Sequence, residues 1–283
     1  MQLQQNLPTF TAAGIKVFAI SYDPVEVLAK FAGEFGITYP LLYDQGSVVM
    51  KRYGILNTMI RPEETEYYGL PYPGTYAVGE DGRVTEKSFF RYYRVRPSAQ
   101  SMLKDMFDVD FDAGGDPHVE AAGEGVQVSA VLASDALLFM QRDPLYVRLA
   151  LDPGLHIYRG PVPEGFVATE VTVTGPDGLV VDAPITPEGH PFRVQGIPHD
   201  FEVLDGNVEI EVPISWTQPD NTPDAATHVP LEITVRYQAC DEQQCFIPRT
   251  VVMHLDVPVG RLFRAMPAGA PPPPPPAADP PRG

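Results

Sequence analysis

The sequence predicts an α/β domain followed by an all-β sandwich. Helix-like and strand-like segments alternate over residues 1–108, which is typical of α/β and α+β domains. Beyond residue 124 the helical period disappears, and short strand-like runs follow at about the spacing found in a sandwich. Residues 109–123 between the two are small, acidic and glycine-containing, so we expect them to form a linker.

Helices in the first domain are predicted from capping residues and from apolar residues on one face. Gly14 is expected to end the first helix, Pro24 to begin the second, and Gly36 to end it. Ser98 stands near the start of the last helix, where its hydroxyl can cap free backbone N–H groups. The predicted helices cover residues 2–14, 24–36, 47–54 and 97–107.

Strands in the first domain are predicted from short apolar runs rich in β-branched and aromatic residues. The run IKVFAIS, residues 15–21, is typical of a buried parallel strand, and residues 38–44 form the next run. Residues 75–90 have the pattern of a β-hairpin that turns at Asp81 and Gly82.

The second domain, residues 124–260, is predicted to be an antiparallel sandwich. In its run LEITVRYQAC, residues 231–240, apolar and polar side chains alternate, so one face is buried and the other polar. The predicted strands cover residues 126–132, 145–151, 168–175, 206–216, 231–239 and 250–259.

Composition limits the function. The chain has 20 basic and 37 acidic residues, a net charge of -17, and such a field repels nucleic acid and anionic lipid. No run of 18 apolar residues is present to span a membrane, and the first residues lack the pattern of a secretory signal. Residues 261–283 hold a polyproline tract and are expected to form an extended, disordered tail.

The two cysteines of the chain, Cys240 and Cys245, flank the polar connection DEQQ. A four-residue hairpin loop places its flanking residues opposite each other, at a separation that suits a disulfide. Cys240 falls on the polar face of its strand. If Cys240 faces Cys245, the apolar positions of the two strands disagree by one residue, which predicts a bulge or break near Pro248.

The pair has several interpretations. It can be a structural clip, a pair of quiet thiols, a metal ligand set or a redox couple. A metal site needs about four ligands, and no second cysteine pair or histidine cluster completes one, so no metal is expected. Asp241 and Glu242 would raise the thiol pKa and favour exchange within a docked complex. The residues alone leave the structural and redox interpretations open.

The stretch YQACDEQQCFIP, together with LDPGLHIYRG and LDGNVEIEVPI, resembles the N-terminal periplasmic domain of the thiol:disulfide interchange protein DsbD, over roughly residues 124–258. The resemblance implies an immunoglobulin-like sandwich in which Cys240 and Cys245 exchange electrons with thioredoxin-like partners, Cys245 forming the mixed disulfide.

The same resemblance implies that His156, Tyr158, Tyr237 and Gln238 lie near the redox pair. A cap loop would come from residues 189–201, through Phe192 or Phe201. It also implies an extracytoplasmic, periplasmic setting.

Residues 1–108 resemble the thioredoxin-fold redoxins of the AhpC/TSA, or peroxiredoxin, group. The resemblance rests on GIKVFAISYDP, FAGEFGITYPLLYD, YGILN and GLPYPGTYAVGEDGRV, and it implies a cis-proline at Pro73. The family's first strand and reactive cysteine are missing, and residues 1–108 contain no cysteine, so no peroxidase activity is expected. We therefore expect Met1 to be an internal methionine of a longer protein.

Two functions remain. The first is a thiol-disulfide redox protein that acts through Cys240 and Cys245 on thioredoxin-like partners and needs no cofactor. The second is a non-catalytic binding or scaffold protein with a degenerate redoxin domain and a structural disulfide.

Overall fold

The computed structural model divides into two compact units, Leu3–Pro71 and Tyr72–Leu262, with Gln2 grouped with the second. Each unit is described by itself. Most of the expected tail, residues 262–283, lies outside the described residues. The structure describes residues 2–63, 67–90, 94–109, 117–123, 125–193, 200–219 and 225–261.

The first helix predicted from the sequence is found as two short helices. The break falls at Asn6, just before Pro8, and Pro8 has no backbone N–H with which to continue the ladder of the preceding turn. The helices of this region are α1 (Gln2–Gln5), α2 (Leu7–Ala12), α3 (Val25–Phe35), the 3-10 helix η1 (Gln45–Ser47) and α4 (Val48–Arg52).

Strands β1 (Ala19–Ser21) and β2 (Leu41–Tyr43) pair in parallel, with Ala19 opposite Leu41. Helix α3 connects them and ends at Gly36, whose φ of 60° lies in the left-handed region. This strand–helix–strand unit confirms the predicted α/β arrangement of the region. No helix in the described part of the chain is long and apolar enough to cross a membrane.

The second unit begins with the predicted hairpin. Strands β3 (Thr75–Val78) and β4 (Val84–Ser88) are antiparallel, and Gly82 in their turn has a φ of 76°. Ser98 caps the predicted last helix, α5 (Ala99–Phe107), by accepting a hydrogen bond from the backbone N–H of Ser101.

Helix α5 adjoins the sandwich, although the sequence placed it in the first domain. The preceding strand β5 (Arg96–Pro97) pairs in parallel with β8 (Gln141–Leu151) of the sandwich. Lys104 of α5 forms an ion pair with Glu209 and lies 4.0 Å from the ring centroid of Tyr146. These contacts are non-local, so local sequence patterns do not reveal them. The domain limits 108/109, 123/124 and 260/261 remain a prediction.

A strand lies inside the stretch predicted as a linker. Strand β6 (His118–Ala122) pairs with β7 (Val126–Leu132), and alternate residues Val119 and Ala121 pack against the core. Residues 110–116 of the predicted linker lie outside the described residues. The two-residue alternation of HVEAA is a strand pattern that the composition of the stretch obscured.

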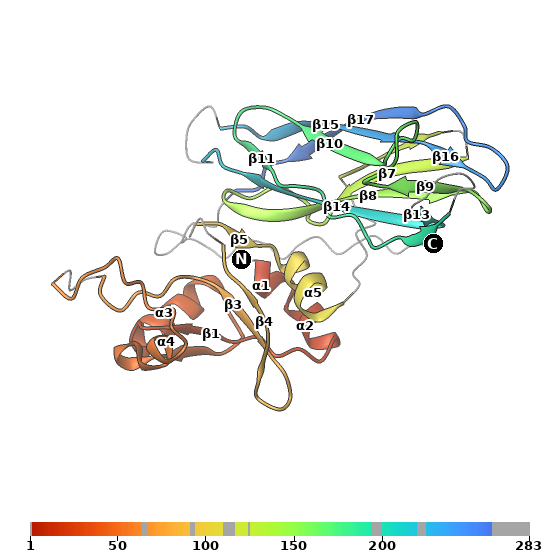
Figure 1. Cartoon of the computed structure of the whole chain (residues 1–283). Helices are drawn as coiled ribbons and strands as arrows, with labels where there is room; N and C mark the ends of the chain where they lie inside the picture. Colours follow the sequence, from red (N-terminus) through yellow and green to blue (C-terminus); the bar gives the residue numbers. More distant parts are fainter. Residues whose placement is uncertain are drawn as a thin grey trace, which may run out of the picture. The chain divides into compact units, whose positions relative to one another are not determined.

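The second unit is rich in strands, as predicted (Figure 1). One sheet has the strand order β11-β14-β8-β7-β6, and β5 pairs with β8 at its side. A second sheet has the order β10-β15-β17, and a third has the order β12-β13-β9-β16. The remaining strands are β9 (His156–Arg159), β10 (Glu170–Thr174), β11 (Leu179–Val181), β12 (His190–Phe192), β13 (Phe201–Asp205), β14 (Asn207–Trp216), β15 (His228–Tyr237), β16 (Ala239–Cys240) and β17 (Arg249–Pro258).

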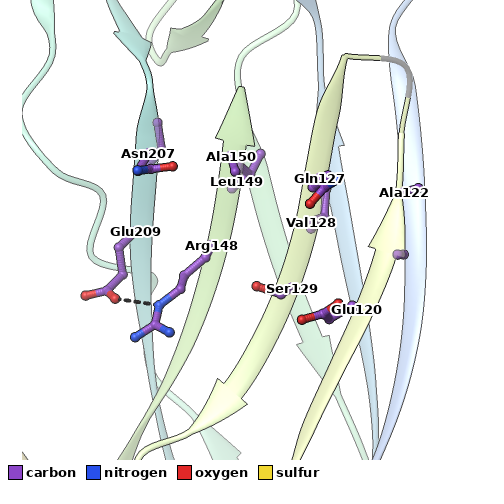
Figure 2. A pocket seen from close by; sticks show the side chains of 12 residues that line it. Glu120, Ala122, Gln127, Val128, Ser129, Arg148, Leu149, Ala150, Asn207 and Glu209 are labelled. Carbon is purple, nitrogen blue, oxygen red and sulfur yellow. Dashed lines mark hydrogen bonds and ion pairs between the residues drawn. The ribbon is translucent and has the colours of Figure 1, made fainter. Parts of the chain in front are cut away.

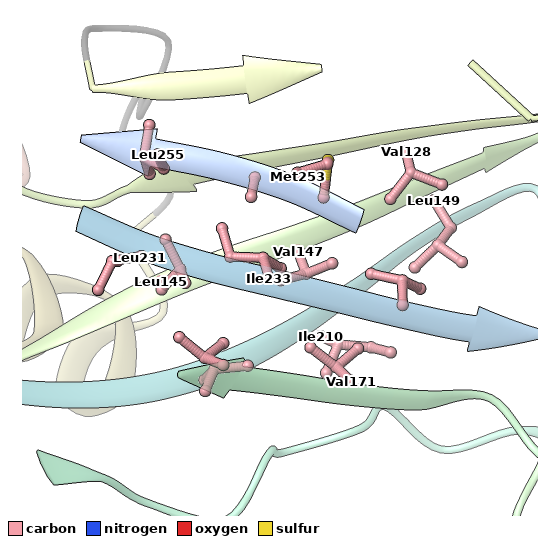
Figure 3. Packing of buried hydrophobic residues seen from close by; sticks show 14 of the residues in the cluster. Val128, Leu145, Val147, Leu149, Val171, Ile210, Leu231, Ile233, Met253 and Leu255 are labelled. Carbon is pink, nitrogen blue, oxygen red and sulfur yellow. The ribbon is translucent and has the colours of Figure 1, made fainter. Parts of the chain in front are cut away.

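The core lies between the sheet of β15 and β17 and the sheet of β7, β8 and β14 (Figure 3). Ile233 of β15 and Met253 of β17 meet Val147 of β8 and Ile210 of β14 in this cluster, and all four side chains are buried. Each such side chain contributes about 1.5–3 kcal/mol on burial, so this layer supplies a large part of the stability of the unit.

A shallow hollow lies on a face of the six-stranded sheet, over β6, β7, β8 and β14 (Figure 2). Small side chains such as Ser129 and Ala150 line it, beside the ion pair of Arg148 and Glu209, 2.9 Å apart. Cys240 belongs to a different sheet, that of β9 and β16, and Cys245 forms an isolated bridge to it.

Candidate functional site

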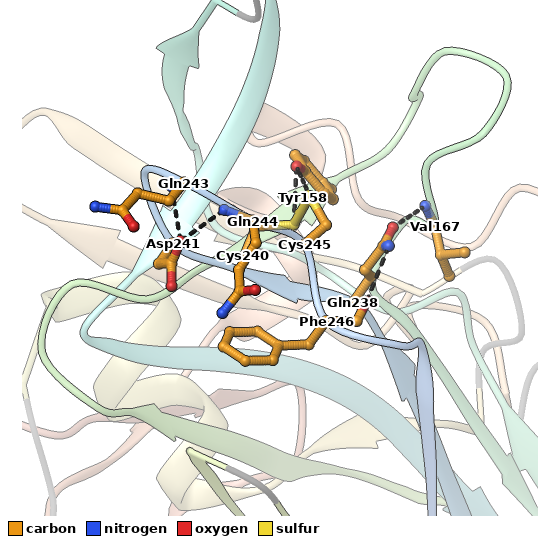
Figure 4. The surroundings of a disulfide bond; sticks show 9 residues. All are labelled: Tyr158, Val167, Gln238, Cys240, Asp241, Gln243, Gln244, Cys245 and Phe246. Carbon is orange, nitrogen blue, oxygen red and sulfur yellow. Dashed lines mark hydrogen bonds between the residues drawn. A yellow bond between two sulfur atoms is a disulfide. The ribbon is translucent and has the colours of Figure 1, made fainter.

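Cys240 and Cys245 form a disulfide, with their Cα atoms 4.0 Å apart, and face each other across an antiparallel bridge (Figure 4). Cys240 belongs to β16, which pairs with β9 so that Cys240 lies opposite His156. The predicted break before the next strand is confirmed. β15 and β17 place Val235 opposite Val251, a register shifted by one residue from the pairing of the cysteines.

The two cysteines differ in burial. Cys240 is only 1% exposed, whereas Cys245 is an exposed residue. The expectation that Cys240 occupies the polar face of its strand is therefore wrong. β15 ends at Tyr237, and after Gln238 the chain continues as β16 in another sheet, where Cys240 is covered by aromatic side chains.

The turn between the cysteines is fixed by Asp241. Its carboxylate accepts hydrogen bonds from the backbone N–H groups of Gln243 and Gln244, each at 2.7 Å. These bonds hold the pKa of Asp241 below its usual value, so Asp241 carries a full negative charge beside the disulfide at neutral pH. This local hydrogen-bond pattern is a common reason for aspartate in turns.

Gln238 fixes the segment that follows the turn. Its side-chain oxygen accepts a hydrogen bond from the N–H of Val167 at 3.0 Å, and its amide nitrogen donates to the carbonyl of Phe246 at 3.2 Å. The N–H of Phe246 donates in turn to the carbonyl of Ala239 at 2.9 Å. Gln238 therefore holds the backbone next to Cys245.

Tyr158 contacts both sulfurs. Its hydroxyl donates a hydrogen bond to Sγ of Cys240 at 3.0 Å and lies 3.2 Å from Sγ of Cys245. Burial raises the pKa of Tyr158, so the hydroxyl keeps its proton. Phe166 and Phe201 surround the tyrosine ring, with centroids 5.1 and 5.4 Å from it.

His156 lies on the same face of β9 as Tyr158, two residues earlier. It is 8% exposed, and its ring centroid is 5.6 Å from that of Tyr158 and 4.4 Å from that of Phe192. Burial lowers the pKa of His156, and the neighbouring His190 lowers it further, while the carboxylates of Asp205 and Asp241 oppose the shift. The imidazole is therefore neutral at neutral pH.

The predicted cap residues reach this cluster. Phe192 packs on His156, Phe201 packs on Tyr158, and the centroids of the two phenylalanine rings are 6.1 Å apart. Residues 194–199 of the predicted cap loop lie outside the described residues. Phe166 was not anticipated, because it comes from a loop whose sequence carries no pattern that points to the cysteines.

Tyr237 packs in a different cluster from Cys240, and Pro73 follows a trans peptide bond. Tyr237 belongs to the core cluster of the sandwich, whereas Cys240 belongs to the aromatic cluster with Tyr158. The bond before Pro73 is not cis; in the described part of the chain, the cis peptide bond precedes Pro161. The trans form is favoured by about 0.5–1 kcal/mol before proline, so a proline motif alone does not establish a cis bond. Within the described ranges, no group of three or more potential ligand side chains could hold a metal ion.

Comparison with known proteins supports both resemblances. Residues 1–87 match the AhpC/TSA family, and residues 126–256 match the N-terminal domain of thiol:disulfide interchange protein DsbD. Two proteins from two strains of Mycobacterium tuberculosis, whose names include the term peroxiredoxin, are 36% identical over 85 residues, which is 29% of this chain and 50% of each relative. The chain thus spans about half the length of the curated relatives it matches.

Two solved structures show weaker likeness. The N-terminal periplasmic domain of ScsB from Proteus mirabilis is 18% identical, with a TM-score of 0.35 over 50% of each chain. The reduced N-terminal domain of DsbD from Neisseria meningitidis is 16% identical, with a TM-score of 0.29 over 46% of this chain and 83% of its own. The chain therefore joins a segment that is similar to the AhpC/TSA family, residues 1–87, to a segment that is similar to the N-terminal domain of DsbD, residues 126–256.

Proposed function

We propose that the chain exchanges disulfides with thioredoxin-fold proteins through Cys240 and Cys245. The observation that carries the proposal is the asymmetry of the pair. Cys245 is an exposed residue, while Cys240 is buried and its Sγ accepts a hydrogen bond from Tyr158. An incoming thiolate needs one reachable sulfur and one sulfur that can leave, and this arrangement supplies both.

In the proposed reaction, a partner thiolate attacks Sγ of Cys245. The disulfide breaks, Cys240 leaves as a thiolate, and a mixed disulfide joins Cys245 to the partner. The second thiolate of the partner then attacks the partner's own sulfur and releases Cys245 as a thiolate. The partner becomes oxidised, and the pair in this chain gains two electrons and, in its neutral form, two protons. The same steps reversed oxidise the pair.

Tyr158 assists the departure of Cys240. A thiolate accepts a stronger hydrogen bond than a disulfide sulfur, because it carries a full charge. The hydroxyl therefore stabilises the reduced form more than the oxidised form. This effect opposes the cost of placing a charge in the aromatic surroundings of Cys240.

The surface beside Cys245 supports recognition of a partner with apolar and cationic groups. Ile247 is 80% exposed, and the backbone of the preceding Phe246 is held at both its N–H and its carbonyl. Asp241 and Glu242 add negative charge to the turn. A rigidly held apolar side chain with negative charges beside it favours a partner surface that carries an apolar patch and positive charges.

We infer an extracytoplasmic setting. The ScsB domain named above is described as periplasmic, and a disulfide persists in an oxidising compartment. No peroxidase activity is proposed, because residues 1–108 hold no cysteine.

The alternative, a structural clip in a binding or scaffold protein, is favoured by the near-complete burial of Cys240. The reduction potential separates the two functions. Equilibration of the full chain with thiol redox buffers should give a value above about -300 mV if the pair exchanges. A more negative value, together with no exchange with reduced thioredoxin, would favour the clip.

A further inference from the structure

His156 has a buried ring nitrogen whose bonding the oxidised structure leaves unexplained. Nε2 of His156 is buried and has no hydrogen-bond partner among the described residues. Leaving a buried polar atom unpaired costs about 1–3 kcal/mol. Such an atom therefore calls for an explanation, such as a partner present in another state of the protein.

Asp205 of β13 and Cys240 of β16 both lie opposite His156, and Cys240 is the one whose hydrogen-bonding capacity changes on reduction, so we take Cys240 as the candidate partner. His156 and Cys240 lie directly opposite each other in the antiparallel pair of β9 and β16. Opposed residues have Cβ atoms about 4.5–5.5 Å apart and side chains on the same face. Tyr158, on the same face of β9, already reaches Sγ of Cys240 at 3.0 Å. Phe192 packs on the imidazole and restricts its orientation.

We propose that Nε2 of His156 accepts the proton of the Cys240 thiol when the reduced pair closes on a mixed disulfide. The inference rests on the proposed function and assigns the residue that makes Cys240 nucleophilic. The proton moves from Sγ of Cys240 to Nε2. The Cys240 thiolate then attacks Sγ of Cys245, the Cys240–Cys245 bond forms, and the bond from Cys245 to the partner sulfur breaks. The partner leaves as a thiolate, and the proton passes from Nε2 to solvent or to that thiolate.

The groups around His156 suit a proton acceptor. His190 of β12, Asp205 of β13 and Asp241 of the cysteine turn are the titratable groups that act on it, besides Tyr158 of its own strand. The lowered pKa of His156 keeps its lone pair free at neutral pH, and the two carboxylates stabilise the imidazolium that forms transiently. Tyr158 retains its proton and acts as a donor, so the two side chains have different roles.

The test uses the reduced full chain and the chromogenic disulfide 5,5′-dithiobis(2-nitrobenzoate). The first thionitrobenzoate is released when a cysteine is labelled, and the second when the other cysteine closes the disulfide. The rate of this second step is measured from pH 5 to pH 10 by stopped-flow absorbance. His156→Phe keeps a ring against Phe192 but removes the base. His190→Gln is the matched control, because His190 lies beside His156 but is exposed.

In His156→Phe, closure at pH 7 should slow by on the order of 100-fold, the typical contribution of a general base. The rate should then rise with pH and meet that of the unmodified chain once Cys240 ionises unaided. His190→Gln should keep the rapid closure at pH 7, with a small shift of its profile toward higher pH, because His190 lowers the pKa of His156. If His156→Phe fails to fold, His156→Gln replaces it with the same expectation. Superimposed profiles, or a rate deficit that is the same at every pH, would overturn the role of His156.

Failure of the proposed function has a different signature. If the pair does not exchange with protein partners, reduced thioredoxin fails to reduce the unmodified chain. The closure step with the small reagent still reports on His156 in that case, because it needs only the two thiols of this chain.

Discussion

Replacement of Tyr158 by phenylalanine removes the hydroxyl that contacts both sulfurs and keeps the ring packed by Phe166 and Phe201. A hydrogen bond to a charged group contributes about 1.5–3 kcal/mol, whereas a disulfide sulfur is a weak acceptor. Loss of the hydroxyl therefore removes more stabilising free energy from the reduced form, which has a Cys240 thiolate, than from the oxidised form. Since 30 mV corresponds to about 1.4 kcal/mol for two electrons, the reduction potential should fall by about 30–60 mV.

The assay is equilibration of full chains with graded ratios of reduced and oxidised dithiothreitol, followed by alkylation and mass measurement of the reduced fraction. The shift should be present at high pH, where Cys240 is a thiolate, and should fade at low pH. Tyr237→Phe is the control, because Tyr237 is a buried tyrosine of the sandwich core, and its potential should stay unchanged. A Tyr158→Phe potential that equals the unmodified value at every pH would refute the reasoning.

Three further results are expected. Burial raises the pKa of Asp143 to about 6, so the fold loses stability as the pH rises toward that value. Between pH 4 and pH 7 the unmodified chain should lose about 2–2.5 kcal/mol more than Asp143→Asn, and equal pH slopes in urea unfolding would contradict this. Ile247→Ser should slow reduction by thioredoxin but not by dithiothreitol, while Val252→Ser, another exposed apolar residue, should change neither rate. Gln238→Leu should lower the unfolding free energy by about 1–3 kcal/mol in thermal unfolding, because the N–H of Val167 loses its partner, and an unchanged stability would show that the bond contributes nothing.

The order of folded segments was predictable from local patterns. The helix that ends at Gly36, the hairpin with Gly82 in its turn and the cap at Ser98 all depend on residues close in sequence. The register shift before Pro248 was also predictable, because the sequence alone shows which alternate positions of each strand are apolar and that these positions do not match across the cysteine turn. Long-range contacts were not predictable in this way. The pairing of β5 with β8, for example, has no signal in the local sequence.

The candidate site divides in the same way. Resemblance to a known family predicted that His156 and Tyr158 lie near the cysteines, and the two-residue alternation of strands predicted that both side chains lie on one face of a strand. Burial of Cys240 was missed, because simple alternation assumes one continuous strand, and the chain instead changes sheets after Tyr237. The contribution of Phe166 depends on tertiary packing that no sequence spacing encodes.

The central claim is that Cys245 is the sulfur that joins this chain to its partner, and trapping tests it most directly. Cys240→Ser and Cys245→Ser chains are each incubated with a thioredoxin variant whose resolving cysteine is replaced by serine and whose remaining cysteine carries thionitrobenzoate. Covalent complexes are resolved by non-reducing electrophoresis. The account predicts a stable complex with Cys240→Ser, which retains the exposed Cys245, and little with Cys245→Ser. Equal trapping by both chains, or trapping by Cys245→Ser alone, would contradict it.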